Sequence, residues 1–361
     1  MEPIEYIPKI VRASLDNDNK AVRLISLNLL RRLKKSNPKV AEQIAEALDY
    51  NAIGSSAKRA MGIYSSPTDN ENKNNLLKVE EPIKIDKPIF DKKINSFINE
   101  FIDERDKSLE LLNAGLLPTS SIILYGPTGS GKTYLAKYLA GKLNLKFATL
   151  DLATAISSYL GKTGQNLKNI LEYAKEEPTL LLLDEFDSIA KKRDDNTELG
   201  ELKRIVNVLL KELEDWPYHS IIIAATNYPE LLDKAIWRRF DIAIEIGYPS
   251  KQERIKIIDR ALYDQDNSVD ENIKEVIANV TEGLSPDSII KIVTRARRVN
   301  ILKDENIVKA LLIETLKEIG SDNVNFNKEL SVELRKNTDM SITKIADLLG
   351  KSRSTIQYYL K

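Results

Sequence analysis

Five short apolar runs, separated by stretches with helical periodicity, occupy the middle of the chain. They read SIILY, KFATLDL, TLLLLD, SIIIAAT and DIAIEI, and they fall within residues 121–246. Nearly continuous apolar strands between helices are typical of a parallel sheet that is buried on both faces. The pattern therefore predicts an α/β domain over residues 88–249, with a parallel sheet and helices on both of its faces.

The chain on either side of this domain lacks strand patterns. Apolar positions at helical spacing within residues 5–48 predict a small helical N-terminal domain over 1–63. Residues 64–87 are rich in Asn, Pro and charged residues, which predicts a linker. After the strands, helical patterns predict a small helical domain over 250–322 and a further helical unit over 326–361.

Composition excludes several kinds of chemistry. The 361 residues contain 54 basic and 54 acidic side chains, so any affinity for nucleic acid or membrane has to be local. The absence of cysteine excludes disulfides and thiolate chemistry, and the single histidine, His219, excludes any site that needs two imidazoles. No apolar run is long enough to cross a bilayer, and the first residues, MEPIEYIPK, lack a signal sequence. We therefore expect a cytoplasmic protein without a membrane partner.

The motif GPTGSGKT follows the first apolar run directly and precedes a helical pattern. It matches the phosphate-binding loop (Walker A) pattern G-x-x-x-x-G-K-[ST] in the strand-to-helix context that this pattern requires. Glycines allow backbone N–H groups to approach phosphate oxygens, and the positive end of the following helix points toward them. We expect Lys132 to neutralise the β- and γ-phosphates of a nucleotide and Thr133 to hold Mg²⁺. The predicted nucleotide-binding residues are Gly126, Pro127, Thr128, Gly129, Ser130, Gly131, Lys132 and Thr133.

The run TLLLLDEFDSI supplies a second part of the predicted site, a Walker B motif. Its apolar strand brings Asp184 to the carboxyl edge of the sheet, where a carboxylate can support Mg²⁺ and its bound water. Glu185 follows directly and can act as a base toward the attacking water or orient it. A protein that only sensed nucleotide would not need Glu185, so the pair favours ATP hydrolysis.

The segment SIIIAATNYPELLDKAIWRRFD resembles the one that marks AAA-type ATPases of the AAA+ superfamily, and the resemblance covers about residues 86–300. It implies that Asn227 helps to position the lytic water. It also implies that Arg238 or Arg239 reaches the nucleotide of a neighbouring subunit, with Arg239 the better aligned because it precedes Phe240. A homo-oligomeric ring, most often a hexamer, follows from this resemblance. The stretch TEGLSPDSII is similar to the helix start in the small lid domain that closes over the nucleotide.

The stretch SSYLGKTGQ follows the second strand pattern. In AAA unfoldases the corresponding loop carries an aromatic residue, an aliphatic residue and glycine, and it projects into the central pore. The resemblance assigns this role to Tyr159, Leu160 and Gly161. The aromatic ring of Tyr159 can wedge against a polypeptide without demanding a sequence, but an ordinary packing role is the alternative.

The run SITKIADLLGKSRSTIQYYLK resembles a helix-turn-helix. We expect its apolar positions to face inward, Gly350 to turn the chain and Ser352 to cap the second helix. Residues of the exposed side can meet phosphates and base edges in a DNA major groove: Lys351, Arg353, Ser354, Thr355, Gln357 and Tyr358. Four basic residues oppose one acidic residue over 341–361. This tail therefore predicts DNA contact as one interpretation, and a protein-binding or structural helix pair as another.

Together the motifs predict a Mg·ATP-hydrolysing AAA ATPase that forms a ring and remodels or translocates protein substrates. The N-terminal helices would recruit a substrate or a partner protease, since the leader and linker are also similar to those of bacterial AAA ATPases paired with subtilisin-like proteases. Two alternatives remain open. One is a DNA-associated ATPase, such as a transposition or replication helper, targeted by the tail. The other is a nucleotide-dependent scaffold with negligible turnover.

Overall fold

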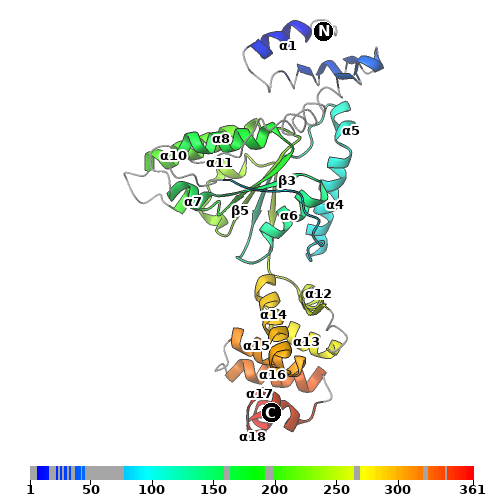
Figure 1. Ribbon diagram of the computed structural model, residues 1–361, viewed down its shortest axis with the longest axis vertical. Coiled ribbons are helices and arrows are strands. Elements are labelled where there is room, and N and C mark those ends of the chain that lie inside the picture. The colour runs from blue at the N-terminus through cyan, green and yellow to red at the C-terminus, as the bar shows by residue number, and fades with distance from the viewer. Residues whose placement is uncertain are drawn as a thin grey trace. The chain divides into compact units, whose positions relative to one another are not determined.

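The computed structural model (Figure 1) describes most of the chain and divides it into two compact units. The first unit comprises Met1–Lys87, Asn95–Gly126 and Lys132–Glu245, and the second comprises Pro88–Ile94, Pro127–Gly131 and Ile246–Lys361. The residues described are 6–15, 22, 25–26, 28–30, 32–33, 37–41, 43–44, 77–157, 163–191, 199–263, 269–319, 324–337 and 340–361.

A six-stranded sheet with the order β1-β3-β4-β5-β2-β6 organises the first unit. Its strands are β1 (Lys78–Glu80), β2 (Ser121–Tyr125), β3 (Lys146–Asp151), β4 (Thr179–Asp184), β5 (Ile221–Thr226) and β6 (Ile242–Glu245). All neighbours pair in parallel except β1, which runs antiparallel along β3. The predicted parallel sheet is therefore confirmed, and each of the five apolar runs forms one of its parallel strands.

Alternate strand residues face opposite sides of this sheet, and helices cover both sides (Figure 1). On one side, strand residues such as Leu181 and Ile222 share a buried core with α8 (Thr163–Glu176) and α10 (Leu199–Glu214). On the other side, α6 (Lys132–Lys142) packs against β3, β4 and β5. Further helices described for this unit include α1 (Tyr6–Leu15), α4 (Lys92–Asp106, whose first residues count with the second unit), α5 (Ser108–Asn113), α7 (Leu152–Ser157), α9 (Ser188–Lys191), the 3-10 helix η2 (Pro229–Leu231) and α11 (Lys234–Trp237).

Part of the segment 64–87, expected to be a linker, is ordered structure. Strand β1 pairs with β3, and Leu77 just before it is 1% exposed and belongs to the core. The chain then runs along α6, where Glu80 pairs with Lys137 Nζ at 3.0 Å and the Asp86 carbonyl accepts from Tyr134 at 3.0 Å. The expectation failed because three strand residues among charged and polar neighbours give too short an apolar signal.

One glycine permits the close approach of this segment to α6. A Cβ atom built on Gly141 would lie 2.1 Å from the carbonyl oxygen of Ile83. Such a distance is far below van der Waals contact, so only glycine fits at this helical position.

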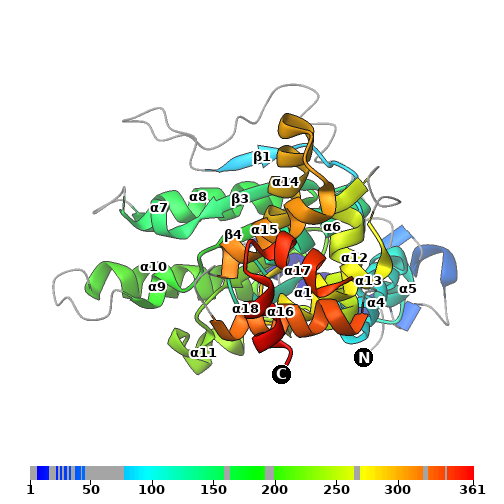
Figure 2. The ribbon, with the colours of Figure 1, turned by 90° about the horizontal axis from the view of Figure 1, so that it is seen from below.

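The second unit is helical. Its helices are α12 (Lys251–Leu262), α13 (Glu271–Val280), α14 (Pro286–Lys303), α15 (Ile307–Ile319), α16 (Val324–Asn337), α17 (Ile342–Leu349) and α18 (Arg353–Tyr359). Serine or aspartate side chains cap the starts of α12, α13, α14, α17 and α18, as expected for residues that satisfy free N–H groups. Figure 2 shows α17 and α18 beside α15 and α16.

All seven helices contribute to one apolar core. Fully buried members include Ile289 of α14, Leu330 of α16 and Ile356 of α18. Helices α16 to α18, expected to form a further unit over 326–361, thus complete the core of the preceding helices. The domain boundary predicted near residue 322 runs through this shared core.

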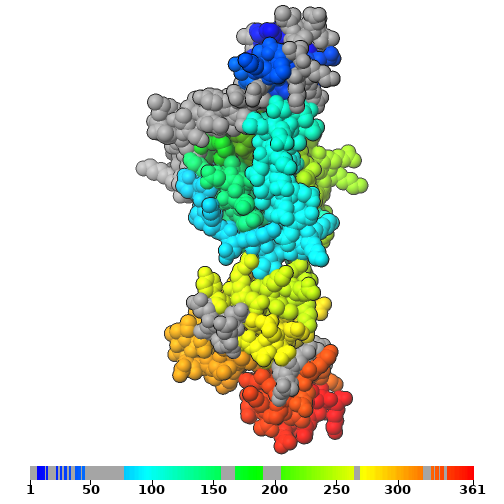
Figure 3. Space-filling model, turned by 90° about the vertical axis from the view of Figure 1, so that its right-hand side faces the viewer, coloured from blue at the N-terminus to red at the C-terminus, as the bar shows by residue number. Residues whose placement is uncertain are grey.

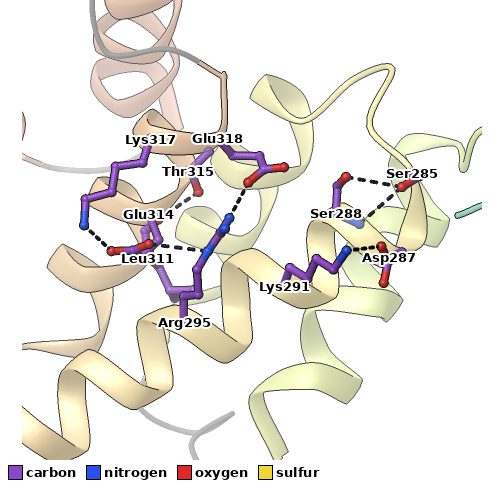
Figure 4. A network of polar contacts seen from close by, with 10 residues as sticks. All are labelled: Ser285, Asp287, Ser288, Lys291, Arg295, Leu311, Glu314, Thr315, Lys317 and Glu318. Carbon is purple, nitrogen blue, oxygen red and sulfur yellow. Dashed lines mark hydrogen bonds and ion pairs between the residues drawn. The ribbon is translucent and has the colours of Figure 1, made fainter.

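A polar network joins α14 to α15 on the surface of this core (Figure 4). The Glu314 side chain is 6% exposed; it pairs with Arg295 Nε at 3.5 Å and with Lys317 Nζ at 2.5 Å. Arg295 also pairs with Glu318. Two cations thus compensate the buried charge of Glu314.

The single histidine has a structural contact in the first unit. The His219 ring Nε2 lies 2.8 Å from the carbonyl oxygen of Lys175, a structural contact remote from the phosphate-binding loop. In the part of the chain that the structure describes, no helix has both the length and the apolar character to cross a bilayer.

Candidate functional site

The phosphate-binding loop connects the carboxyl end of β2 to the start of α6. Gly129 has φ +75° and Gly131 has φ +103°, backbone conformations that strongly favour glycine. The Ser130 hydroxyl is buried and has no hydrogen-bond partner among the described residues. A buried hydroxyl without a protein partner beside a helix N-terminus fits a loop that receives phosphate oxygens.

Lys132, the first residue of α6, is buried and directed back over the loop. Its Nζ donates to the carbonyl oxygen of Gly126 at 2.8 Å. Burial lowers the pKa of Lys132 to about 8, and the nearby carboxylates of Asp184 and Asp187 offset part of this effect. Burial therefore disfavours the ammonium form of Lys132, and a bound anionic phosphate would favour that form.

Thr133 and Asp184 meet at the carboxyl edge of the sheet. The Thr133 hydroxyl lies 3.3 Å from a carboxylate oxygen of Asp184, although 51 positions separate the two residues in sequence. A hydroxyl and a carboxylate at this separation are hard oxygen ligands of the kind that Mg²⁺ prefers. The structure thus brings together the two residues predicted to hold Mg²⁺, and their chemistry fits that ion.

Glu185 occupies a sharp turn immediately after β4. Its φ is +50°, which is uncommon for a residue with a side chain, and its N–H donates to the Asp184 carboxylate at 2.9 Å. The Glu185 side chain is exposed. The turn therefore separates the two carboxyl groups, leaving Asp184 beside Thr133 and Glu185 open to solvent.

The end of β5 connects the other parts of the site. The Gly126 N–H donates to the carbonyl oxygen of Thr226 at 3.3 Å, and the Phe186 N–H donates to that of Ala225 at 2.9 Å. Since β5 lies between β2 and β4, its last two residues hold both the phosphate-binding loop and the turn that carries Glu185. Asn227 follows directly, so it lies between these two parts.

Asp187, which no sequence motif singled out, fixes this arrangement. It is 2% exposed, and one of its carboxylate oxygens accepts from the Thr226 hydroxyl at 3.1 Å and the Asn227 N–H at 3.3 Å. The signal was present as the second aspartate of the string DEFD. From sequence alone this aspartate could not be distinguished from a surface charge.

Arg238 and Arg239 belong to a segment anchored at the opposite edge of the sheet. The Asp241 carboxylate accepts from the N–H groups of Ser120 at 2.9 Å and Ser121 at 3.0 Å, where β2 begins. Arg239 pairs with Glu214 at the end of α10. Arg238 is exposed and forms no ion pair with the described residues. The structure does not bring these arginines to the Thr133–Asp184 cluster of their own chain.

Within the second unit, the start of α14 lies against the loop residue Gly129. The Asp287 N–H donates to the Gly129 carbonyl oxygen at 3.3 Å, and a Cβ on Gly129 would lie 2.7 Å from the Ser285 hydroxyl. Asp287 is in turn paired with Lys291 at 2.7 Å (Figure 4). No site residue was predicted at the start of α14, so Asp287 is a neighbour of the loop that only the structure reveals.

The residues predicted to form a pore loop, Tyr159, Leu160 and Gly161, lie outside the described residues. Their predicted role therefore stays a prediction.

Comparison with known proteins identifies the central domain. Residues 122–248 match the family model described as "ATPase family associated with various cellular activities (AAA)". An uncharacterized AAA family ATPase of Sinorhizobium fredii is 34% identical over 242 residues, which are 65% of this chain and 66% of that protein. A proteasome-activating nucleotidase of Methanopyrus kandleri is 29% identical over 290 residues, 76% of this chain and 66% of the relative.

A shorter sequence match and a solved structure extend the comparison. A cell division cycle protein 48 homolog of Archaeoglobus fulgidus is 37% identical over 193 residues, 52% of this chain and 26% of the relative. Among solved structures, the FIGL-1 AAA domain superposes with a TM-score of 0.54 at 18% identity, covering 81% of this chain and 94% of that one. The chain spans less than two thirds of the length of these curated relatives, 66% at most.

Proposed function

Because this chain belongs to the AAA family of ATPases through residues 122–248, we propose that it hydrolyses Mg·ATP within a homo-oligomeric ring and uses the energy to remodel protein substrates. The observation that carries the proposal is the contact between Thr133 and Asp184 at 3.3 Å, with Lys132 directed over the adjoining loop. The groups come from the end of β4 and from the loop and helix that follow β2, with β5 between the two strands, and each has a role in phosphoryl transfer.

Each residue has a distinct task in the proposed reaction. Lys132 neutralises charge on the β- and γ-phosphates, while Thr133 and Asp184 hold Mg²⁺ and its bound water. Mg²⁺, when bound, neutralises the charge that develops on the phosphate oxygens. Glu185 accepts a proton from the attacking water or orients it, and Asn227 positions that water. Asp187 keeps Asn227 in place through the backbone N–H of Asn227.

The position of the arginines supports action on a neighbouring subunit. Ser121 begins β2 and Gly126 directly follows it, so the two lie about 16 Å apart at the usual rise per strand residue. Asp241 is bonded at the Ser121 end, away from the phosphate-binding loop. In the proposal, Arg238 and Arg239 therefore contact the nucleotide bound to a neighbouring copy of the chain. The copies form a hexameric ring. An arginine that arrives there stabilises the negative charge of the transition state.

Protein substrates are the proposed target because of the relatives. One relative is a proteasome-activating nucleotidase, and another is a peroxisomal ATPase, pex6, of Schizosaccharomyces pombe. In the proposal, Tyr159, Leu160 and Gly161 grip the polypeptide in the ring's pore. The N-terminal helices recruit the substrate or a partner protease.

Mixing of variant subunits tests the proposal. Lys132→Ala subunits cannot use nucleotide but keep their arginines, whereas Arg238→Ala/Arg239→Ala subunits keep an intact loop but supply no arginine. Each variant alone should release phosphate at a small fraction of the wild-type rate. We expect a mixture of the two to regain activity, because some intact loops then face intact arginines. A mixture no more active than its components would contradict a shared site.

A further inference from the structure

Helices α17 and α18 form a helix-turn-helix whose fold is fixed by its caps and its core. Gly350 ends α17 in the left-handed conformation, with φ +61°. The Ser352 hydroxyl then accepts from the Thr355 N–H at 3.1 Å and starts α18. Ile345 and Ile356 are fully buried where the two helices join the core. The turn between them therefore has three residues, 350–352.

Helix α16 supports this pair as a third helix. It contacts both α17 and α18, and Arg335 near its end donates to the carbonyl oxygen of Met340 at 2.8 Å. Three packed helices of this kind present the last helix outward, as helix-turn-helix proteins do when that helix enters a major groove. Residues 324–337 and 340–361 carry the colours nearest the red end of the scale in the space-filling view (Figure 3).

The outer face of α18 is polar and basic. Arg353, Ser354, Gln357 and Tyr358 are exposed, and Lys351 precedes them in the turn. Lys351 and Arg353 form no ion pair with the residues that the structure describes. Over 341–361 the charge is +3, from four basic residues and one acidic residue, in a chain whose net charge is zero. This face is complementary to a polyanion.

A protein partner fits this face less well. Protein interfaces bury a core of aromatic and aliphatic anchors. Among the exposed residues of α17 and α18, Tyr358, at 69% exposure, is the only large apolar side chain. Protein–DNA interfaces are instead polar and positively charged, as this face is.

We propose that residues 341–361 bind double-stranded DNA, with the outer face of α18 in the major groove. Lys351 and Arg353 contact phosphates and fix the position of the helix on the duplex. Gln357, one turn after Arg353, is placed to read a base edge, and an amide of this kind pairs with adenine. The proposal stands on the second unit alone and does not depend on ATP hydrolysis.

The test measures binding of a fluorescein-labelled duplex of about 20 base pairs by anisotropy, with the full chain and without nucleotide, over a series of salt concentrations. The test variant is Lys351→Ala/Arg353→Ala. Its control is Arg298→Ala/Lys303→Ala, which removes the same two kinds of charge from exposed positions of α14 in the same unit. Each phosphate contact contributes about 0.9 to the slope of log affinity against log salt, so the test variant should lose about 1.8 from that slope.

We expect wild type and control to bind alike, and the test variant to bind at least about tenfold more weakly at low salt. Equal binding by test and control variants would overturn the proposal, as would the absence of duplex binding by wild type. Displacement of the duplex by an equal charge concentration of polyglutamate would also overturn it, since the face would then bind acidic proteins in general.

Selection from a randomised duplex pool should enrich a sequence motif with wild type, and Gln357→Ala should relax that motif at one position. A pool that stays random would overturn the base-reading role of α18.

Discussion

The unusual state of Lys132 predicts how nucleotide affinity depends on pH. Burial lowers the pKa of Lys132 from 10.5 to about 8 in the protein without nucleotide. At about 1.36 kcal/mol per pKa unit, the site disfavours the charged form by about 3 kcal/mol. A bound phosphate favours that form and raises the pKa again, so binding above pH 8 requires proton uptake. Affinity should therefore be constant below about pH 7 and fall as the pH rises through 8.

The magnitude follows from the fraction of protonated Lys132. At about pH 9 only roughly one tenth of the free protein carries the proton, so affinity should be about tenfold lower than at about pH 7. The free energy of unfolding depends on pH in the opposite direction. Between pH 8 and 10.5 Lys132 binds more protons in the unfolded chain than in the folded one, so its contribution to stability increases as the pH rises through this window. Arg105, whose pKa burial lowers to about 10, stays charged over the measured range.

Titration with a fluorescent ADP analogue at fixed Mg²⁺ and ionic strength provides the assay. Lys132→Gln is the matched control, because its amide is neutral at every pH; this variant should bind weakly and without the decline. Calorimetry in two buffers of different ionisation enthalpy should show uptake of about half a proton near pH 8. An affinity that is flat from pH 7 to 9 in the wild type, or an equal decline in Lys132→Gln, would refute the reasoning.

Three further changes test other parts of the structure. Asp187→Ala should lower kcat by about tenfold or more with a smaller change in KM, because Asn227 loses its anchor. Asp187→Asn should recover part of the rate, and nucleotide affinity should begin to fall at a lower pH than in the wild type. Equal rates in the wild type, Asp187→Ala and Asp187→Asn would rule out a positioning role. Glu185→Gln should retain nucleotide binding but lower phosphate release by about a hundredfold or more, and unchanged release would favour the scaffold alternative. Gly141→Ala should destabilise the chain by about 1–3 kcal/mol in urea denaturation, because the new Cβ would lie 2.1 Å from the Ile83 carbonyl oxygen. This outcome is opposite to the usual stabilisation of a helix by alanine. The control is Gly247→Ala, whose Cβ would meet nothing within 4 Å.

The sequence was most informative where a residue's chemistry and its periodicity agree. The five apolar runs became the five parallel strands, because Ile and Leu in unbroken runs bury equally well on both faces of a sheet. The helices of the second unit also followed their predicted patterns, since Ser and Asp at their starts provide caps that are visible in sequence.

What the sequence did not reveal depends on contacts between distant residues. Strand β1 is three residues long and is defined by its partner β3 rather than by its own composition. Asp187 looks like any other acidic residue until β5 is placed beside it. The proximity of Asp287 to Gly129 likewise joins residues 158 positions apart, and no local pattern encodes it.

The core shared by α12 to α18 affects how the tail can be studied and what it can do. Removing residues 326–361 would uncover apolar side chains of α13 and α15, so a truncated chain would report on misfolding and aggregation instead of ligand binding. Point substitutions on the outer face avoid this problem. The same continuity makes the tail and α14 parts of one body, and α14 begins against Gly129. A ligand bound to α18 would therefore be tethered to the same compact unit that holds Gly129 of the phosphate-binding loop.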